Sequence, residues 1–205
     1  MLRLSAILTL SLYALLASAL DSTTLGVGYQ NYTCSSTTLT YSSIGALASL
    51  FDLSCMASKP EFADVQSKAY DIWIAPGDVK ASANSIGAKV DAPTLLGYHY
   101  FINSPTSPGT GALSPEWDFT LRSHDPALFV VGAKVGDLPA PPPSDPGPKL
   151  DVDWLMLDGV PGYDGLNLLA GEIFRVETVG GQPPSSCKAG SEPIQVKYTA
   201  KYFLY

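Results

Sequence analysis

The stretch IQVKYTAKYFLY, residues 194–205, alternates apolar and polar side chains over most of its length. Its apolar positions recur every second residue: Ile194, Val196, Tyr198, Ala200, Tyr202 and Leu204. Lys197 and Lys201 stand between them. A period of two is the repeat of a β-strand with one buried face, because successive side chains point to opposite sides. The pattern predicts a terminal strand whose lysines point to solvent.

Segments upstream of this strand also have strand character and are separated by turns rich in Gly, Pro and Ser. The predicted strands span residues 27–34, 70–75, 95–102, 117–121, 128–135, 152–157 and 172–179. Residues 44–56 instead place Leu47, Leu50 and Phe51 on one helical face, which predicts a short helix. The expected fold class is all-β: a single antiparallel β-sandwich or barrel with long loops and at most short helices.

Residues 138–150 form a Pro-rich segment with six prolines. Such a segment is extended and exposed, because proline lacks the backbone N–H that a ladder needs. We interpret it as a surface loop inside one domain that covers residues 20–205. A linker between two domains is the alternative, but the pieces on either side are short for separate cores.

The first 19 residues have the organisation of a secretory signal peptide. Arg3 is the only charge before Asp21, an apolar run covers residues 4–16, and Ala17 and Ala19 form an A-x-A end. We therefore expect a secreted, extracellular protein. No later segment is apolar enough to cross a bilayer, so no membrane association is expected after cleavage.

The chain is acidic, with a net charge of −7 before cleavage and one basic residue fewer once Arg3 is removed. It has no basic cluster that would neutralise phosphates, so nucleic acid is not an expected partner. Aromatic residues make up 10% of the chain, and Tyr dominates with 11. This composition suits a secreted β-domain.

Three cysteines, Cys34, Cys55 and Cys187, are present. In an oxidising compartment two of them are expected to pair, but the sequence leaves open which two, and also whether all three are reduced. Asn31 begins the sequon Asn-Tyr-Thr and is a candidate glycosylation site.

The pair Gly26 and Gly28 invites comparison with a dinucleotide-binding loop. That loop needs a preceding strand, a following helix and a third glycine. Here the preceding segment is the predicted signal peptide, the third position is Asn31, and strand-forming residues follow. We expect no nicotinamide cofactor, and a bulge or a close backbone approach explains the glycines better.

His99, Glu116 and Asp118 are the weak candidates for catalysis. A histidine with one or two carboxylates would suit a hydrolase or a metal-assisted enzyme, if the two strands are adjacent. Glu116 and Asp118 point the same way about 7 Å apart on a strand, within the range of inverting glycosidases. A half-buried histidine and a solvated strand face are the alternative interpretation. No metal site is expected.

Tyr98, Tyr100 and Trp117 are candidate ligand-binding residues, because their rings would suit a stacking platform for sugars; Tyr163 would extend it. Ordinary packing is the alternative for all four residues. Arg175 is a further candidate, since an exposed arginine would bind a carboxylate ligand, whereas a buried one would be structural.

Five segments, taken together, resemble a known family. They are GVGYQNYTC (26–34), LGYHYF (96–101), VDWLML (152–157), FRVETVGGQPPSSC (174–187) and VKYTAKYFLY (196–205). The chain resembles a family of secreted fungal and bacterial proteins that carry a domain of unknown function and whose fungal members are often labelled malate dehydrogenase.

The resemblance covers nearly all of the predicted mature chain and implies a secreted single-domain protein without an assigned mechanism. It also implies a disulfide between Cys34 and Cys187, with Cys55 left free. The glycine pair does not support the dehydrogenase label. We expect a binding module at the cell wall or host surface, with cell-wall polysaccharide or a host extracellular protein as partner. A secreted hydrolase using His99 is the alternative.

Overall fold

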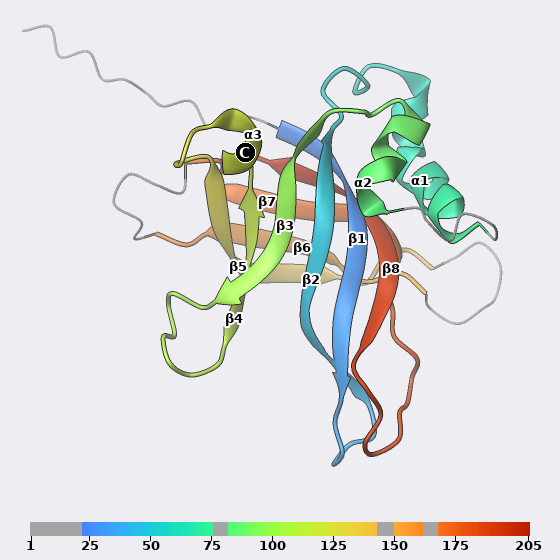
Figure 1. Ribbon diagram of the computed structural model, residues 1–205, viewed down its shortest axis with the longest axis vertical. Helices are drawn as coiled ribbons and strands as arrows, with labels where there is room; N and C mark the ends of the chain where they lie inside the picture. Colours follow the sequence, from blue (N-terminus) through green and yellow to red (C-terminus); the bar gives the residue numbers. More distant parts are fainter. Residues whose placement is uncertain (1–21, 76–81, 143–149, 162–167) are drawn as a thin grey trace, which may run out of the picture.

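The structure is a computed structural model that describes residues 22–75, 82–142, 150–161 and 168–205. Within these residues, antiparallel strands in the order β1 to β8 form a closed barrel, in which β8 pairs with β1 (Figure 1). The strands are β1 (Ser22–Cys34), β2 (Tyr41–Asp52), β3 (Leu95–Asn103), β4 (Leu113–Asp118), β5 (Phe129–Leu138), β6 (Trp154–Gly159), β7 (Glu172–Gly180) and β8 (Ile194–Leu204). The all-β prediction is confirmed, and the barrel is the form it takes.

Short helices supplement the barrel. They are η1 (Pro60–Ala63), α1 (Val65–Ile74), α2 (Ala83–Ile86), η2 (Gly87–Val90) and α3 (Thr120–Ser123). Figure 1 shows α1 and α2 beside the outer face of β1 and β8. In the described part of the chain, no helix has the length and apolarity that crossing a membrane requires.

The seam between β1 and β8 closes the barrel. It runs from Ser22 opposite Leu204 to Tyr32 opposite Ile194. Gly28 lies against the backbone of β2, and Gly26 lies against the ring of Tyr202, so a Cβ at either position would overlap its neighbours. The two glycines therefore serve close packing inside a strand, as the sequence interpretation proposed.

Apolar side chains pack on both sides of the barrel wall. One core fills the interior and includes Leu50, Trp117, Tyr198, Tyr202 and Ile173. A second core lies between the outer face of the wall and the helices; its members are Leu25, Val27, Phe51, Leu53, Met56, Val65, Ala69, Trp73, Ile86, Val90 and Ala92. Eight-stranded barrels have an interior narrow enough for side chains to fill, and the large aromatic residues here do so.

Two predicted elements are wrong. Residues 44–56, predicted as a helix, mostly belong to strand β2. Leu50 faces the interior core and Phe51 the outer core, so both faces of the strand are apolar and the period of two disappears. Residues 70–75, predicted as a strand, all belong to helix α1 except Ala75, and the buried Val65, Ala69 and Trp73 of this helix recur every four residues.

The strand predicted over residues 117–121 is shifted. Strand β4 begins earlier, at Leu113, and ends at Asp118. There the Asp118 carboxylate accepts hydrogen bonds from the backbone N–H and the hydroxyl of Thr120, at 2.8 and 2.6 Å. These bonds favour a turn, and α3 follows.

The prediction that the lysines of β8 point to solvent is also wrong. Lys201 is 0% exposed, because the helical segment 60–74 covers this side of the strand. Its Nζ donates to a carboxylate oxygen of Glu177 and to the carbonyl of Ala63. Lys197 Nζ donates to the carbonyl of Trp73 at 2.8 Å. The polar face of β8 thus binds backbone carbonyls that the short helices leave unpaired.

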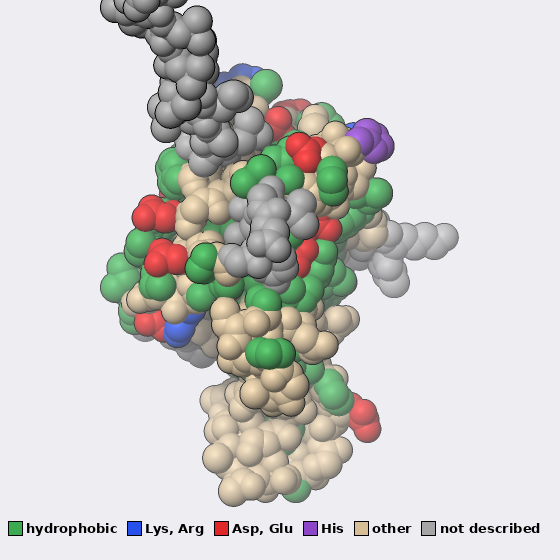
Figure 2. Space-filling model, turned by 90° about the vertical axis from the view of Figure 1, so that its left-hand side faces the viewer, with side chains coloured by type: hydrophobic (Ala, Val, Ile, Leu, Met, Phe, Trp, Pro, Cys, Tyr) green, Lys and Arg blue, Asp and Glu red, His purple; other side chains and the backbone are tan. Residues whose placement is uncertain are grey.

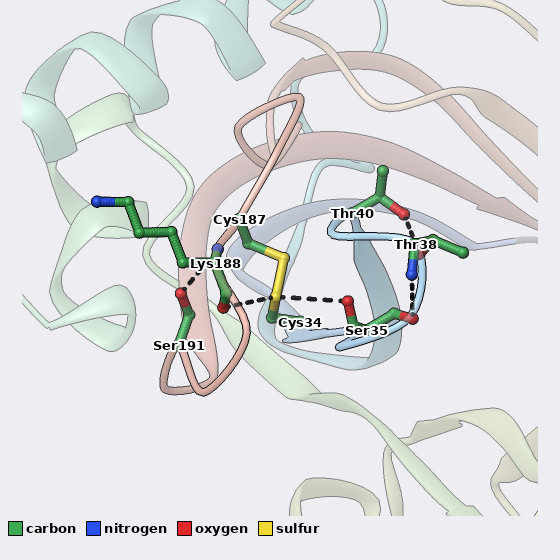
Figure 3. Close-up of a disulfide and its surroundings, with 7 residues drawn as sticks. All are labelled: Cys34, Ser35, Thr38, Thr40, Cys187, Lys188 and Ser191. Carbon is green, nitrogen blue, oxygen red and sulfur yellow. Dashed lines mark hydrogen bonds between the residues drawn. A yellow bond between two sulfur atoms is a disulfide. The ribbon is translucent and has the colours of Figure 1, made fainter.

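A disulfide joins Cys34, at the end of β1, to Cys187 in the connection between β7 and β8 (Figure 3). Beside it, the backbone N–H of Cys187 donates to the carbonyl of Leu39 at 2.9 Å. The pairing implied by the family resemblance is therefore present. Cys55 is free and exposed.

Two predicted segments lie wholly or partly outside the described residues. The signal peptide, residues 1–19, is not described, and neither are residues 143–149 of the Pro-rich segment. Strands β5 and β6, on either side of that segment, are antiparallel neighbours in the barrel.

We predict that Lys201→Met destabilises the protein through loss of the ion pair with Glu177. Breaking a buried pair costs about 3–5 kcal/mol. Because the Glu177 side chain is 40% exposed, we expect a smaller decrease of about 2 kcal/mol in the free energy of unfolding. Urea denaturation measures it. The control Lys134→Met removes an exposed pair with Asp137 and should change stability by less than about 1 kcal/mol. Equal effects of the two substitutions would contradict this role.

We also predict that the double variant Cys34→Ser/Cys187→Ser loses about 2–5 kcal/mol of stability. The disulfide joins residues 153 positions apart, so it strongly restricts the unfolded chain. Urea unfolding without reductant tests this expectation. Cys55→Ser is the matched control and should stay within about 0.5 kcal/mol of the parent. A double variant as stable as the parent would refute the prediction.

Candidate functional site

His99 lies inside the barrel, where its ring stacks on Trp117 with centroids 4.4 Å apart. Its Nδ1 donates to the backbone carbonyl of Glu116 at 2.9 Å, since a carbonyl only accepts. Burial lowers the pKa of His99 to about 3, and the charge of Arg175 contributes in the same direction. His99 is therefore a neutral residue of the core.

Glu116 and Asp118 do not join His99 in a site. His99 pairs with Trp117 across β3 and β4, while Glu116 pairs with Tyr100 and Asp118 with Tyr98. Successive side chains of a strand point to opposite faces. The two acids thus share the outer face with the tyrosines, and the predicted histidine–carboxylate constellation does not assemble.

Trp117 and Arg175 also belong to the interior. Trp117 is 2% exposed, so it takes no part in a surface platform with Tyr98 and Tyr100. Arg175 lies opposite Tyr202 on β8, and its guanidinium donates through Nη2 to the carbonyl of Asp153 at 2.8 Å. The structure therefore favours the structural interpretation of Arg175. Tyr163 lies outside the described residues.

On the outer face, one tyrosine connects the two acids. The Tyr100 hydroxyl lies 2.9 Å from a Glu116 oxygen and 2.8 Å from an Asp118 oxygen. These accepting oxygens are thus closer together than the roughly 7 Å expected from the strand repeat. Desolvation raises the pKa of Glu116, and the charge of Asp118 adds to this effect. Burial also raises the pKa of Tyr100. We call Tyr100, Glu116 and Asp118 the acid cluster.

Beside the acid cluster, α2 and the sheet enclose a groove of about 250 Å³, which we call the outer-face groove. Its lining residues are Tyr29, Leu47, Ala48, Ser49, Ser82, Ala83, Asn84 and Tyr98. The Ser49 hydroxyl donates to the Asn84 side-chain oxygen at 2.5 Å. The Asn84 amide nitrogen lies 3.5 Å from the Tyr98 hydroxyl. A serine, an amide and a phenol therefore meet at the wall of the groove.

The outer-face groove and the acid cluster adjoin. Ser49 is the neighbour of Tyr98 across β2 and β3, and Tyr98 is the neighbour of Asp118 across β3 and β4. One row of side chains thus runs from the groove to the acids. Sequence reasoning found Tyr98, Tyr100 and both acids. It missed Tyr29, Ser49 and Asn84, because they belong to β1, β2 and α2, which only the folded chain brings together.

The chemistry of the groove suits binding. Ser49 donates to an amide oxygen, which is not a base able to activate a nucleophile. Among the described residues, no group of three or more His, Cys, Asp or Glu side chains has the arrangement to hold a metal ion. The hydroxyl, amide, phenol and carboxylate groups offer donors and acceptors to a hydroxyl-rich ligand.

A second hollow, of about 360 Å³, lies over β5, β6 and β7. Its lining is largely apolar and includes Trp154, Met156, Phe174 and Val176. Few polar groups there would orient a ligand. The outer-face groove is the better candidate because it combines aromatic rings with converging polar groups.

The chain thus defines a class of protein: a closed eight-stranded antiparallel barrel, counted over the described residues, with a filled interior and its candidate site on the outer wall. Residues 17–205 match the family model described as "Protein of unknown function (DUF3455)". The chain belongs to this family. No curated protein and no solved structure matches it.

Buried His99 makes stability depend on pH. The unfolded-state pKa of histidine is about 6.5, and the folded-state pKa is about 3. Its neutral form therefore contributes full stability above about pH 6.5. That contribution is lost as the pH falls toward 3, because the unfolding equilibrium constant then rises roughly tenfold for each pH unit.

We predict that His99→Phe reduces this acid sensitivity, whatever its effect on stability at neutral pH. The unfolding equilibrium constant rises as the pH is lowered from about 7 to 4.5. We expect this rise to be roughly a hundredfold smaller for the variant than for the parent, as measured by urea unfolding at the two pH values. His124→Asn is the control, because His124 is exposed and outside the core; it should retain the acid sensitivity of the parent. A His99→Phe profile parallel to the parent would be incompatible with a neutral buried His99.

Proposed function

We propose that this protein is a secreted, non-catalytic binding module that holds extracellular polysaccharide, such as a cell-wall glycan, in the outer-face groove. The observation that carries the proposal is the meeting of Tyr98, Asn84 and Ser49 at one wall of this groove. The barrel interior is filled by aromatic side chains, so we look to the outer face for ligand binding.

Sugar rings combine apolar C–H faces with many hydroxyl groups, and the groove offers complements to both. Tyr29 and Tyr98 are partly exposed there, and an aromatic ring suits an apolar face. The exposed Asn84 amide offers both a donor and an acceptor, and the buried Ser49 hydroxyl holds it in place by donating to its oxygen. Polar groups placed in this way orient a ligand and make its binding specific.

The acid cluster extends the same surface. Carboxylate oxygens accept hydrogen bonds from hydroxyl groups, and such charge-assisted bonds are stronger than neutral ones. Because Tyr98 and Asp118 are cross-strand neighbours, a chain of several sugar units would reach from the groove to Glu116 and Asp118. A polymer therefore fits this face better than a single sugar.

Several observations support secretion. The first 19 residues have the pattern of a signal peptide, and the family match begins only at residue 17. The disulfide between Cys34 and Cys187 suits an oxidising compartment. Asn31, the sequon residue, is partly exposed on β1, and its side-chain oxygen accepts from Gln195.

We predict that the protein is retained on a cell-wall polysaccharide and that Tyr98→Ala weakens this binding about tenfold, which corresponds to about 1.4 kcal/mol. Sedimentation with insoluble chitin, cellulose and β-1,3-glucan measures retention, and titration with soluble fragments of the retained polymer measures affinity. Asn84→Ala should weaken binding in the same direction, since it removes two hydrogen-bonding groups.

Tyr205→Ala is the matched control, because Tyr205 is a tyrosine accessible to solvent, as Tyr98 partly is, but it lines a different hollow, over β7 and β8. It should bind as the parent does. The proposal fails if no polysaccharide retains the protein, or if Tyr98→Ala and Tyr205→Ala behave alike. Capture of a host extracellular protein without any glycan binding would also count against it.

A further inference from the structure

The end of the barrel formed by the β1–β2 turn carries an unusual concentration of hydroxyl groups. We define residues 35–43 as the hydroxyl tip. Its exposed hydroxyl residues are Ser36, Thr37, Thr38, Thr40, Ser42 and Ser43. No charged residue occurs between Ser22 and Phe51. In Figure 2 the lower end of the molecule is largely neutral and polar, whereas acidic and hydrophobic side chains gather on the body.

A disulfide and backbone hydrogen bonds hold the hydroxyl tip in place. The disulfide ties Cys34, directly before the tip, to Cys187 (Figure 3). Within the tip, the backbone N–H of Ser35 donates to Thr40, and that of Leu39 donates to Ser35. Because the tip lies at the end of the barrel, this turn directs its side chains away from the core.

Some of these hydroxyls are available for reaction. Thr38 and Thr40 share a hydrogen bond at 2.7 Å, and the Ser35 hydroxyl accepts from the backbone of Thr38. Ser36 and Thr37 are exposed and make no side-chain hydrogen bond to the described residues that would compete with modification. The tip therefore presents two adjacent accessible hydroxyls.

The loop at residues 104–112 provides a comparison within the same protein. It is also rich in Ser, Thr and Pro. There the Ser104 hydroxyl contacts those of Thr106 and Ser114, and the Thr110 hydroxyl donates to the carbonyl of Ser107. Its hydroxyls are thus largely engaged, in contrast to Ser36 and Thr37.

We infer that the hydroxyl tip is a site of O-glycosylation, centred on Ser36 and Thr37. This inference rests on the secretion included in the proposed function, because the transferases that modify exposed Ser and Thr residues act in the secretory pathway. In the reaction, the hydroxyl oxygen bonds to the anomeric carbon of an activated sugar phosphate. The bond from that carbon to the phosphate oxygen breaks, the phosphate leaves with the electron pair, and a base of the transferase takes the hydroxyl proton.

The surroundings of the tip suit this modification. Regions rich in Ser, Thr and Pro are typical O-glycosylated sequences. Pro183, Pro184, Ser185 and Ser186 directly precede Cys187, which the disulfide joins to Cys34 beside the tip. Figure 1 places the β1–β2 turn at the lower end and α2, which borders the outer-face groove, in the upper half. Glycans on the tip would leave the groove accessible.

The test is secretion of the full chain from budding yeast, removal of N-glycans with an amidase, and intact mass measurement. A second arm carries residues 20–205 behind the leader of the host. We expect hexose-sized increments in both arms, and electron-transfer fragmentation of chymotryptic peptides should place them within residues 35–43. Ser36→Ala/Thr37→Ala should lower the occupancy of that peptide at least twofold. Thr106→Ala/Thr110→Ala, the control pair in the comparison loop, should leave it unchanged.

The inference is overturned if secreted protein has its unmodified mass after N-glycan removal, or if the hexoses map only to residues 104–112. Failure of the full chain to reach the medium would count against the proposed secretion alone, because the arm with the host leader still exposes the tip to the transferases. Polysaccharide binding is measured separately, on unmodified protein, so its loss does not affect this result.

Discussion

The pairing of β1 with β8 closes the barrel and so divides the protein into an interior core and an outer face. It joins residues 22–32 to residues 194–204, near opposite ends of the chain, and converts a succession of neighbouring strands into a closed barrel. Closure leaves the eight strands of the described residues without a free edge. It also explains Gly26 and Gly28, since both make room for the packing of neighbouring strands. The disulfide between Cys34 and Cys187 reinforces the same end-to-end connection.

Closure gives the wall two different environments, and each is filled differently. Inside, aromatic residues such as Trp117 and Tyr202 occupy the space that a wider barrel would leave for a ligand. Outside, η1 and α1 cover part of β8, and Lys197 and Lys201 bind their backbone carbonyls. A helix that would be marginal in isolation is thereby held by packing and by charged donors. The outer-face groove, where α2 borders β2 and β3, carries the proposed binding site.

The alternation of side chains along β3 and β4 decides which candidate residues can act together. His99 and Trp117 turn inward and stack, while Tyr98, Tyr100, Glu116 and Asp118 turn outward. Residues adjacent in the sequence therefore take unrelated roles, whereas residues from separate strands form one surface. This geometry separates the histidine from the acids and gives the acids a phenol as their partner. It also places the tyrosines beside Ser49 and Asn84, whose hydroxyl and amide complete the candidate binding site.

The all-β class and most of the strands could be predicted without a structure, because the period of two and the turn residues are local signals that survive wherever one face is buried. The final strand is the clearest case. Where tertiary packing buried both faces, as around Leu50 and Phe51 in β2, that signal disappeared and a helix was predicted instead. The burial of Lys201 and the contact of α2 with the outer wall arise only when the chain folds. The physical reason is that these features depend on contacts between distant segments, which no local pattern records.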